Sequence, residues 1–155
     1  MITGIDIDPS CAVYVDFPNQ VHIGSQDDPV FPRNVVTKMS GIDIVLDDGS
    51  HIGRHQIATF ETLFPLLPDG GLYLIEDLHT SYWFGLWEGG FRRRGTAIEY
   101  VRNLIDDMRG WYHDRSLGTL AKNQVRSIHM YDSIAVIEKR TRSRPRRISV
   151  GGQAL

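Results

Sequence analysis

Three short apolar runs, each ending in acidic residues, constrain what this chain can fold into more than any other feature. Residues 2–7, 42–46 and 72–75 have the length and the β-branched content of strands. Helical patterns separate strand-like runs along the chain, which predicts a mostly parallel sheet with helices on both faces. Such sheets bind ligands outside the carboxyl ends of their strands. The acids at these ends therefore mark the candidate site: Asp6, Asp8, Asp47, Asp48, Glu76 and Asp77.

The rest of the pattern agrees with a doubly wound α/β fold. The near-continuous apolar run 42–46 is typical of a strand that is covered on both faces. Residues 21–24 form a further short strand, and residues 96–111 carry apolar side chains at helical spacing. The runs 125–131 and 133–138 are joined so tightly that they must pair antiparallel. A second helix has the apolar face Ile57, Phe60, Phe64 and Leu67 and ends at Pro65 and Pro68.

Composition limits the class of protein. A chain of 155 residues with 41% hydrophobic content is expected to form one domain, here residues 1–138. Its only cysteine, Cys11, rules out an intrachain disulfide and favours a reducing compartment. No apolar run is long enough for a membrane span, so we expect a cytoplasmic protein. Residues 139–155 contain no acid and predict a basic, disordered tail, with phosphate or anionic lipid as the alternative partner.

A metal site is the chemistry that best explains the acids. Asp48, Glu76 and Asp77 converge if the strands 42–46 and 72–75 are neighbours, and three carboxylates favour Mg²⁺ or Mn²⁺. His51 follows Asp48 by three residues and would then act as a general base. The alternative is that these acids are helix caps or turn residues. A carboxylate pair such as Glu76-Asp77 is costly without a cation, which favours the metal.

Other features allow two interpretations each. His51 and His55 have the spacing to bind a softer metal from one helix face, and His79 would either line the pocket or face solvent. The segment with Tyr82, Trp83, Phe84 and Trp87 would form a pocket edge or pack in the core. The triplet Arg92–Arg94 fits a solvated loop better than a phosphate site. The body is acidic, so we expect no nucleic-acid partner.

Several of these segments together resemble a known family. Asp-Asp-Gly-Ser-His at 47–51, Leu-Phe-Pro at 63–65, Gly-Gly-Leu-Tyr at 70–73 and Ile-Glu-Asp-Leu-His-Thr-Ser-Tyr-Trp at 75–83 are similar to the metal-dependent sugar O-methyltransferases of macrolide biosynthesis. The resemblance covers most of residues 2–138. It implies a class I, Rossmann-like methyltransferase fold with an antiparallel C-terminal strand, S-adenosylmethionine as cofactor and a glycosylated small molecule as methyl acceptor.

The resemblance also implies roles for single residues. Asp48, Glu76 and Asp77 would hold Mg²⁺, and His51 would take the proton of a sugar hydroxyl. The cofactor would be bound by Asp6, Asp8, Ser25, Gln26, Asp27 and Asp47.

The sequence departs from the family at its N-terminal side. The family's first strand and its glycine-rich turn have no counterpart, although that strand lies in the middle of the family's sheet. We therefore expect an N-terminally truncated domain, completed by a further segment or by a homo-oligomer. The alternatives are a non-catalytic protein of the same fold that serves as a binding module, or a metal enzyme like the cephalosporin hydroxylases.

Overall fold

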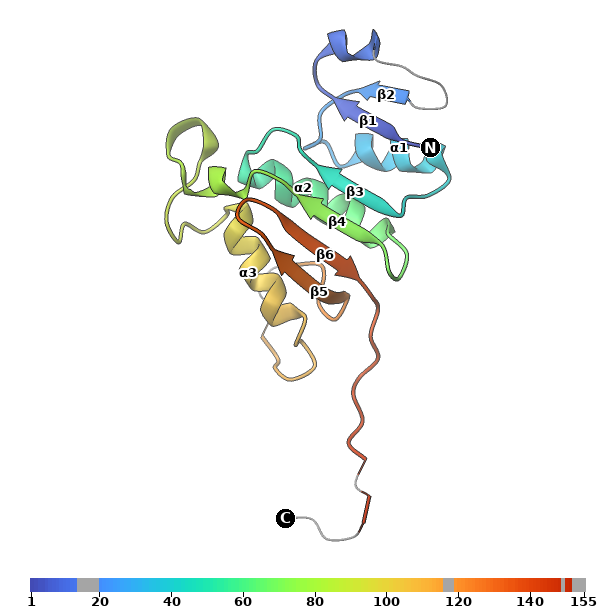
Figure 1. Cartoon of the computed structure of the whole chain (residues 1–155), viewed down its shortest axis with the longest axis vertical. Helices are drawn as coiled ribbons and strands as arrows, with labels where there is room; N and C mark the ends of the chain where they lie inside the picture. The colour runs from blue at the N-terminus through green and yellow to red at the C-terminus, as the bar shows by residue number, and fades with distance from the viewer. Residues whose placement is uncertain (14–19, 116–118, 149, 152–155) are drawn as a thin grey trace.

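The computed structural model describes residues 1–13, 20–115, 119–148 and 150–151, and its strands form two separate sheets (Figure 1). The first sheet has two parallel strands, β1 and β2. The second has the order β3-β4-β6-β5, in which β3 and β4 are parallel and β6 runs antiparallel to both β4 and β5. The strands are β1 (Thr3–Asp6), β2 (Gln20–Ile23), β3 (Ile44–Asp47), β4 (Leu72–Ile75), β5 (Val125–Met130) and β6 (Ala135–Lys139).

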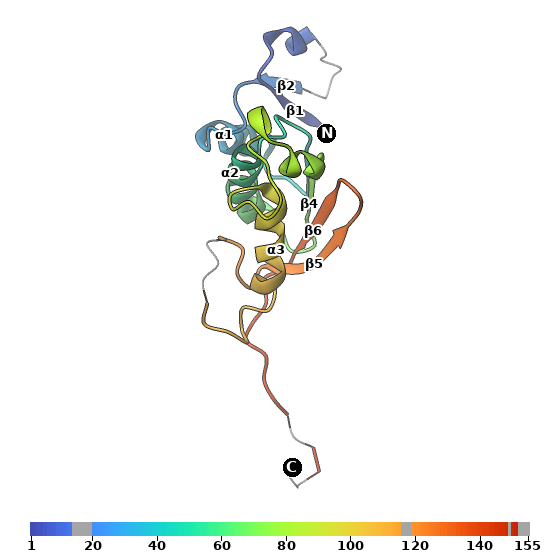
Figure 2. The same ribbon diagram turned by 90° about the vertical axis from the view of Figure 1, so that its left-hand side faces the viewer.

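The three α-helices lie on one face of the strands (Figure 2). They are α1 (Val30–Met39), α2 (Gly53–Leu63) and α3 (Ala97–Asp107), and short 3-10 helices span Pro9–Val13, Phe64–Leu66, Leu78–Tyr82 and Gly85–Trp87. The core lies between these helices and the four-stranded sheet. At its centre the ring of Phe60 stacks on Phe64 at 4.5 Å and meets Tyr73 edge-on at 4.9 Å, measured between ring centroids.

Most predicted elements occur where the sequence pattern put them. Strand β4 coincides with the predicted run 72–75, and β5 and β6 pair antiparallel as expected. The sequence pattern did not predict helix α1, because Pro29 immediately precedes it and Pro32 lies in its first turn, and proline is usually a turn signal. Proline is tolerated in a first turn, where the backbone N–H has no partner within the helix.

Strands β1 and β3 leave a gap between the two sheets. They point the same way in Figure 1, yet neither pairs with the other. A cavity of about 300 Å³ lies between them, lined by Gly4 and Ile5 on one side and by Val45 on the other. The prediction that run 42–46 is covered on both faces is wrong: Ile44 is 63% exposed and Leu46 is 58% exposed. Both side chains are therefore open to solvent, while the α-helices of the described residues lie together on one face of the strands (Figure 2).

The start of the basic segment is attached to the body. Lys139 is the last residue of β6, one position beyond the predicted end of the domain, and its side chain is buried. Its ammonium group donates a hydrogen bond to the carbonyl of Pro65 at 2.6 Å. The backbone N–H of Arg140 donates to the carbonyl of Gln124 at 2.8 Å. Within the described residues, no helix combines the length and the apolar character that a membrane crossing needs.

Candidate metal and cofactor site

The loops that follow β3 and β4 bring together Asp48, His51 and Asp77. One potential ligand atom from each lies within 4.8 Å of the others. The Nε2 atom of His51 is 3.5 Å from a carboxylate oxygen of Asp77. Because β3 and β4 are parallel neighbours, their carboxyl ends meet at one edge, as the sequence pattern predicted.

Unusual backbone conformations aim two of these side chains. His51 has φ 56° and Asp77 has φ 52°, both in the left-handed region that costs a residue with a Cβ some strain. The buried hydroxyl of Thr80 lies 2.9 Å from the carbonyl of His51 and 2.8 Å from that of Asp77, so it is shared between them. Thr80 therefore ties the two loops together. The sequence pattern gave no signal for this role.

Glu76, predicted as the third carboxylate ligand, is not part of this group. Its backbone N–H donates to the carbonyl of Asp47 at 3.0 Å, and its own carbonyl accepts from the amide of Gln56 at 2.9 Å. These bonds fix the backbone at the end of β4, and the side chain is half-buried. Its assignment as a ligand stays a prediction.

The donor set fits a hard divalent cation. Two carboxylates suit Mg²⁺ or Mn²⁺, with water and substrate oxygens completing the shell, and the imidazole of His51 lies beside them. The Nδ1 atom of His51 is buried and has no hydrogen-bond partner among the described residues. His79 lies beside the group, with Nδ1 3.7 Å from Asp77 and 2.6 Å from the hydroxyl of Ser133.

An aromatic surface borders the group on one side. The ring of Trp87 lies 6.2 Å from that of His51, and Trp83 lies 4.7 Å edge-on from His79, measured between centroids. Tyr82, Trp83 and Phe84 are exposed, which favours a pocket edge over core packing. Exposed aromatic faces next to polar groups are the kind of surface that holds a partly apolar ligand such as a glycoside.

A second cavity, of about 220 Å³, lies on the other side of the loop after β3. Three of the six predicted cofactor-binding residues line it: Asp6, Ser25 and Gln26. A backbone hydrogen bond from Asp8 lowers the pKa of Asp6, which keeps that carboxylate charged. Asp8 and Asp27 lie close in sequence to these lining residues but do not line the cavity themselves. The cavity has polar groups for a ribose or an adenine, but on its own it is smaller than a typical ligand pocket.

Asp47, also predicted to face the cofactor, lies behind the loop and lines the larger cavity between β1 and β3. It is only 4% exposed. The hydroxyl of Tyr73 and the amide of Gln26 each donate a hydrogen bond to it at 3.0 Å. Burial raises the pKa of the Asp47 carboxyl to about 6, because these bonds only partly offset the desolvation of the charge.

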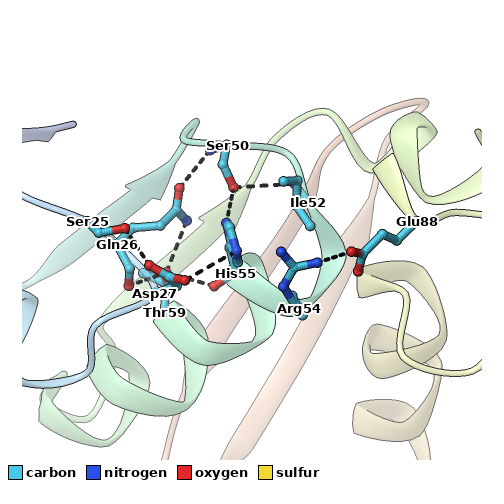
Figure 3. A network of polar contacts seen from close by, with 9 residues as sticks. All are labelled: Ser25, Gln26, Asp27, Ser50, Ile52, Arg54, His55, Thr59 and Glu88. Atoms are coloured by element: carbon cyan, nitrogen blue, oxygen red, sulfur yellow. Dashed lines mark hydrogen bonds and ion pairs between the residues drawn. The ribbon is translucent and has the colours of Figure 1, made fainter. Parts of the chain in front are cut away.

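Gln26 connects the segment after β2 with the loop after β3 and with helix α2 (Figure 3). The side-chain oxygen of Gln26 accepts a hydrogen bond from the backbone N–H of Ser50 at 2.6 Å. The side-chain NH₂ group donates to Asp47 and to Thr59 at 3.0 Å each. Gly49 permits this approach, because a Cβ there would meet the Gln26 oxygen at 1.9 Å. Gln26 was predicted as a cofactor contact, but its bridging role depends on a chain crossing that no local pattern encodes.

His55 does not join His51 in a metal pair within the described residues. Its Nδ1 atom is 2.8 Å from the hydroxyl of Ser50, and its Nε2 atom is 3.3 Å from a carboxylate oxygen of Asp27. Both nitrogens of this ring are therefore engaged. The alternative of a softer metal held by two histidines is not supported.

Comparison with known proteins identifies the fold and shows which enzymes the chain is similar to. No protein-family model matches the chain. The 8-demethyl-8-alpha-L-rhamnosyl tetracenomycin-C 2'-O-methyltransferase of Streptomyces olivaceus is 37% identical over 127 residues, which are 78% of this chain and 33% of that enzyme. The mycinamicin VI 2''-O-methyltransferase of Micromonospora griseorubida is 37% identical over 122 residues, 75% of this chain and 30% of its own length. Over most of its own length the chain is therefore similar to these sugar O-methyltransferases.

A solved structure of a methyltransferase has the same fold. The MycE methyltransferase from the mycinamycin biosynthetic pathway, in complex with Mg, SAH and mycinamycin VI, superposes with a TM-score of 0.81 and 33% sequence identity. The match covers 90% of this chain and 36% of that chain. The predicted class I methyltransferase fold is thereby confirmed. The chain spans about a third of the length of the sugar O-methyltransferases it matches.

Proposed function

We propose that this chain carries the metal and cofactor site of an S-adenosylmethionine-dependent sugar O-methyltransferase that acts on a glycosylated metabolite. The observation that carries the proposal is the group of Asp48, His51 and Asp77 at the ends of β3 and β4. Its sequence relatives methylate rhamnosyl, olivosyl or macrolide sugars according to their names, and solved relatives contain Mg and SAH. Cys11 is half-buried and forms no disulfide within the described residues, which is consistent with an enzyme that acts in the reducing cytoplasm.

The residues of the chain divide the chemistry as follows. Asp48 and Asp77 hold the metal ion, and Glu76 at the same strand end is the further candidate ligand. A bound Mg²⁺ would lower the pKa of the sugar hydroxyl and fix its position. His51 accepts the hydroxyl proton at Nε2, which faces Asp77 at 3.5 Å. The nearby carboxylate stabilises the imidazolium that results, and Trp83 and Trp87 exclude water from the acceptor side.

On the cofactor side, Asp6 and Ser25 contact the ribose and adenine part of the nucleoside, together with Asp8, Asp27 and Gln26. The methyl group then moves from the sulfonium of the cofactor to the sugar oxygen in a direct displacement. The sulfonium brings its own leaving group, so the protein supplies positioning and proton removal only.

The first experiment titrates S-adenosylmethionine into the chain by calorimetry, with and without Mg²⁺. Binding in the micromolar range supports the cofactor site, and an acceptor screen over rhamnosylated and macrolide glycosides then measures methyl transfer. In that assay His51→Ala should lower turnover by about 10²–10⁴-fold, the usual contribution of a general base, with cofactor binding nearly unchanged. Full turnover in His51→Ala would exclude the proposed base. Activity that survives both Glu76→Ala and Asp77→Ala would exclude the proposed metal site.

We further propose that a strand-and-helix segment, joined to the polypeptide ahead of β1, completes this domain. The gap between β1 and β3 has two unpaired parallel edges, which fit one more parallel strand. The crossover from β3 through α2 to β4 places its helix on the covered face. Crossovers between parallel strands are right-handed. A crossover from the added strand to β1 would run across the sheet in the direction opposite to the crossover from β3 to β4. Its helix would therefore lie on the opposite, bare face, over the exposed side chains of Ile44 and Leu46.

The stability of the chain alone tests this second proposal. With two unpaired edges and a bare apolar face, it should self-associate in analytical ultracentrifugation or melt below the range of about 45–65 °C typical of mesophilic domains. Leu46→Lys should reduce self-association without lowering the melting temperature, since the side chain is 58% exposed. A monomer that melts cooperatively within that range would contradict the proposal.

A further inference from the structure

The loop that carries the metal group is held from behind by a chain of polar contacts that runs through His55 (Figure 3). His55 lies in the first turn of α2, and its side chain is 16% exposed. Its ring contacts Ser50 on one side and Asp27 on the other. Ser50 stands between Asp48 and His51 in the sequence, so whatever fixes Ser50 also fixes the backbone of the candidate ligand Asp48 and of the proposed base His51.

The partners decide how the ring is protonated. An ionised carboxylate has no hydrogen to donate, so the contact of the His55 Nε2 atom with Asp27 at 3.3 Å favours the tautomer with the hydrogen on Nε2. The Nδ1 atom then accepts from the hydroxyl of Ser50, and this hydroxyl in turn accepts from the backbone N–H of Ile52 at 3.4 Å. Ser25 donates to the other oxygen of Asp27, and this bond is the main cause of the lowered pKa of Asp27. The contacts therefore form one continuous chain: Ser25, Asp27, His55, Ser50 and Ile52.

The conformation at His51 explains why such a support is needed. With φ at 56°, this residue has a conformational cost that a flexible loop would avoid by relaxing. Gln26 fixes the backbone N–H of Ser50 from one direction, and His55 fixes its side chain from another. Two independent anchors on one residue leave the loop little freedom to move Asp48 and His51 apart.

We infer that His55 is a positioning residue, which holds the loop of Asp48 and His51 in metal-binding geometry through the hydroxyl of Ser50. The inference rests on the proposed function, because it needs a metal at that loop. Groups that orient metal ligands without touching the metal typically change its affinity by about 10–100-fold when they are removed.

The two nitrogens of His55 can be tested separately. In His55→Asn the shorter side chain would place its amide near the position of Nδ1 and keep the contact with Ser50. The longer side chain in His55→Gln would reach the position of Nε2 and keep only the contact with Asp27. His55→Leu keeps neither. Arg54→Ala is the matched control, because Arg54 is the preceding residue in the same turn and its guanidinium pairs with Glu88, away from the loop.

The experiment titrates Mn²⁺ alone into the whole chain and follows the free ion by electron paramagnetic resonance. We expect His55→Leu and His55→Gln to weaken Mn²⁺ binding by about 10-fold or more, and His55→Asn and Arg54→Ala to stay within about 3-fold of the parent chain. Melting temperatures without metal identify a merely structural effect, which would lower affinity and stability together in all three His55 variants.

Each remaining outcome has a definite meaning. Equal Mn²⁺ affinity in the parent chain and His55→Leu would overturn the inference and leave the metal site standing. Weakening in His55→Asn as large as in His55→Leu would overturn the role of the Ser50 contact. A parent chain that binds no Mn²⁺ would remove the metal site of the proposed function and the inference with it.

Discussion

The four-stranded sheet and the β1–β2 unit are built from similar short strands, but they are stabilised differently. In β4 and β6 every second residue is buried against α2 and α3. No residue is buried in the described segments 1–13 and 20–29, which contain β1 and β2. The four-stranded sheet has its own hydrophobic core, whereas the β1–β2 unit borders the cavity next to β3 and is linked to the body by α1 and the Gln26 contacts. Secondary structure alone therefore does not make a segment part of the core.

The largest expected contrast between the two regions comes from truncating one side chain in each. Phe60→Ala removes a buried ring from contact with Phe64, Tyr73 and Tyr100, so it should lower the free energy of unfolding by about 3–5 kcal/mol. Ile7→Ala in the N-terminal unit should change it by less than about 0.5 kcal/mol, since Ile7 is exposed. Urea unfolding measures both. Equal losses would mean that the two regions share one core.

A smaller effect tests the buried carboxyl next to the gap. The folded state raises the pKa of Asp47 from 3.8 to about 6, so protons are bound more tightly in the folded than in the unfolded chain. The stability contribution of Asp47 is therefore greatest below about pH 4 and decreases as the pH rises to 6, by up to about 3 kcal/mol.

Urea unfolding at pH 4.5 and at pH 7.5, in the presence of a chelator, measures this contribution. Relative to Asp47→Asn, the free energy of unfolding of the parent chain should decrease as the pH rises, because asparagine does not titrate. A difference that stays constant with pH would show that Asp47 is hydrated, as it would be if water filled the gap between β1 and β3.

The smallest of the three effects concerns the link itself. Gln26→Leu leaves the N–H of Ser50 and the carboxylate of Asp47 short of a partner, which should cost about 1–3 kcal/mol. Limited proteolysis should then cut the N-terminal segment sooner than in the parent chain. Gln124→Leu is the control, because among the described residues its side-chain amide makes one long hydrogen bond of 3.5 Å, to the carbonyl of Leu120. Equal cleavage rates in both variants would show that Gln26 does not join the regions.

Much of the fold was predictable from the sequence, because several elements depend on local signals. Strand β4 and the pair β5–β6 were found because their residue types and tight connection are local signals. Helix α1 was missed, because its prolines carry the opposite local signal. The exposure of Leu46 was also unpredictable, since an apolar run indicates what a residue prefers and not whether a partner is present to cover it.

The candidate site divides in the same way. The residue pattern alone predicted that acids stand at the ends of parallel strands and that His51 follows one of them, because strand periodicity and chain order are local properties. The folded structure brings Asp77, on a left-handed backbone, within reach of Asp48 and His51. It also decided that Gln26 and His55 reach the loop from other segments. Contacts between distant segments depend on how strands and helices pack in space, and no local pattern of residue types records that.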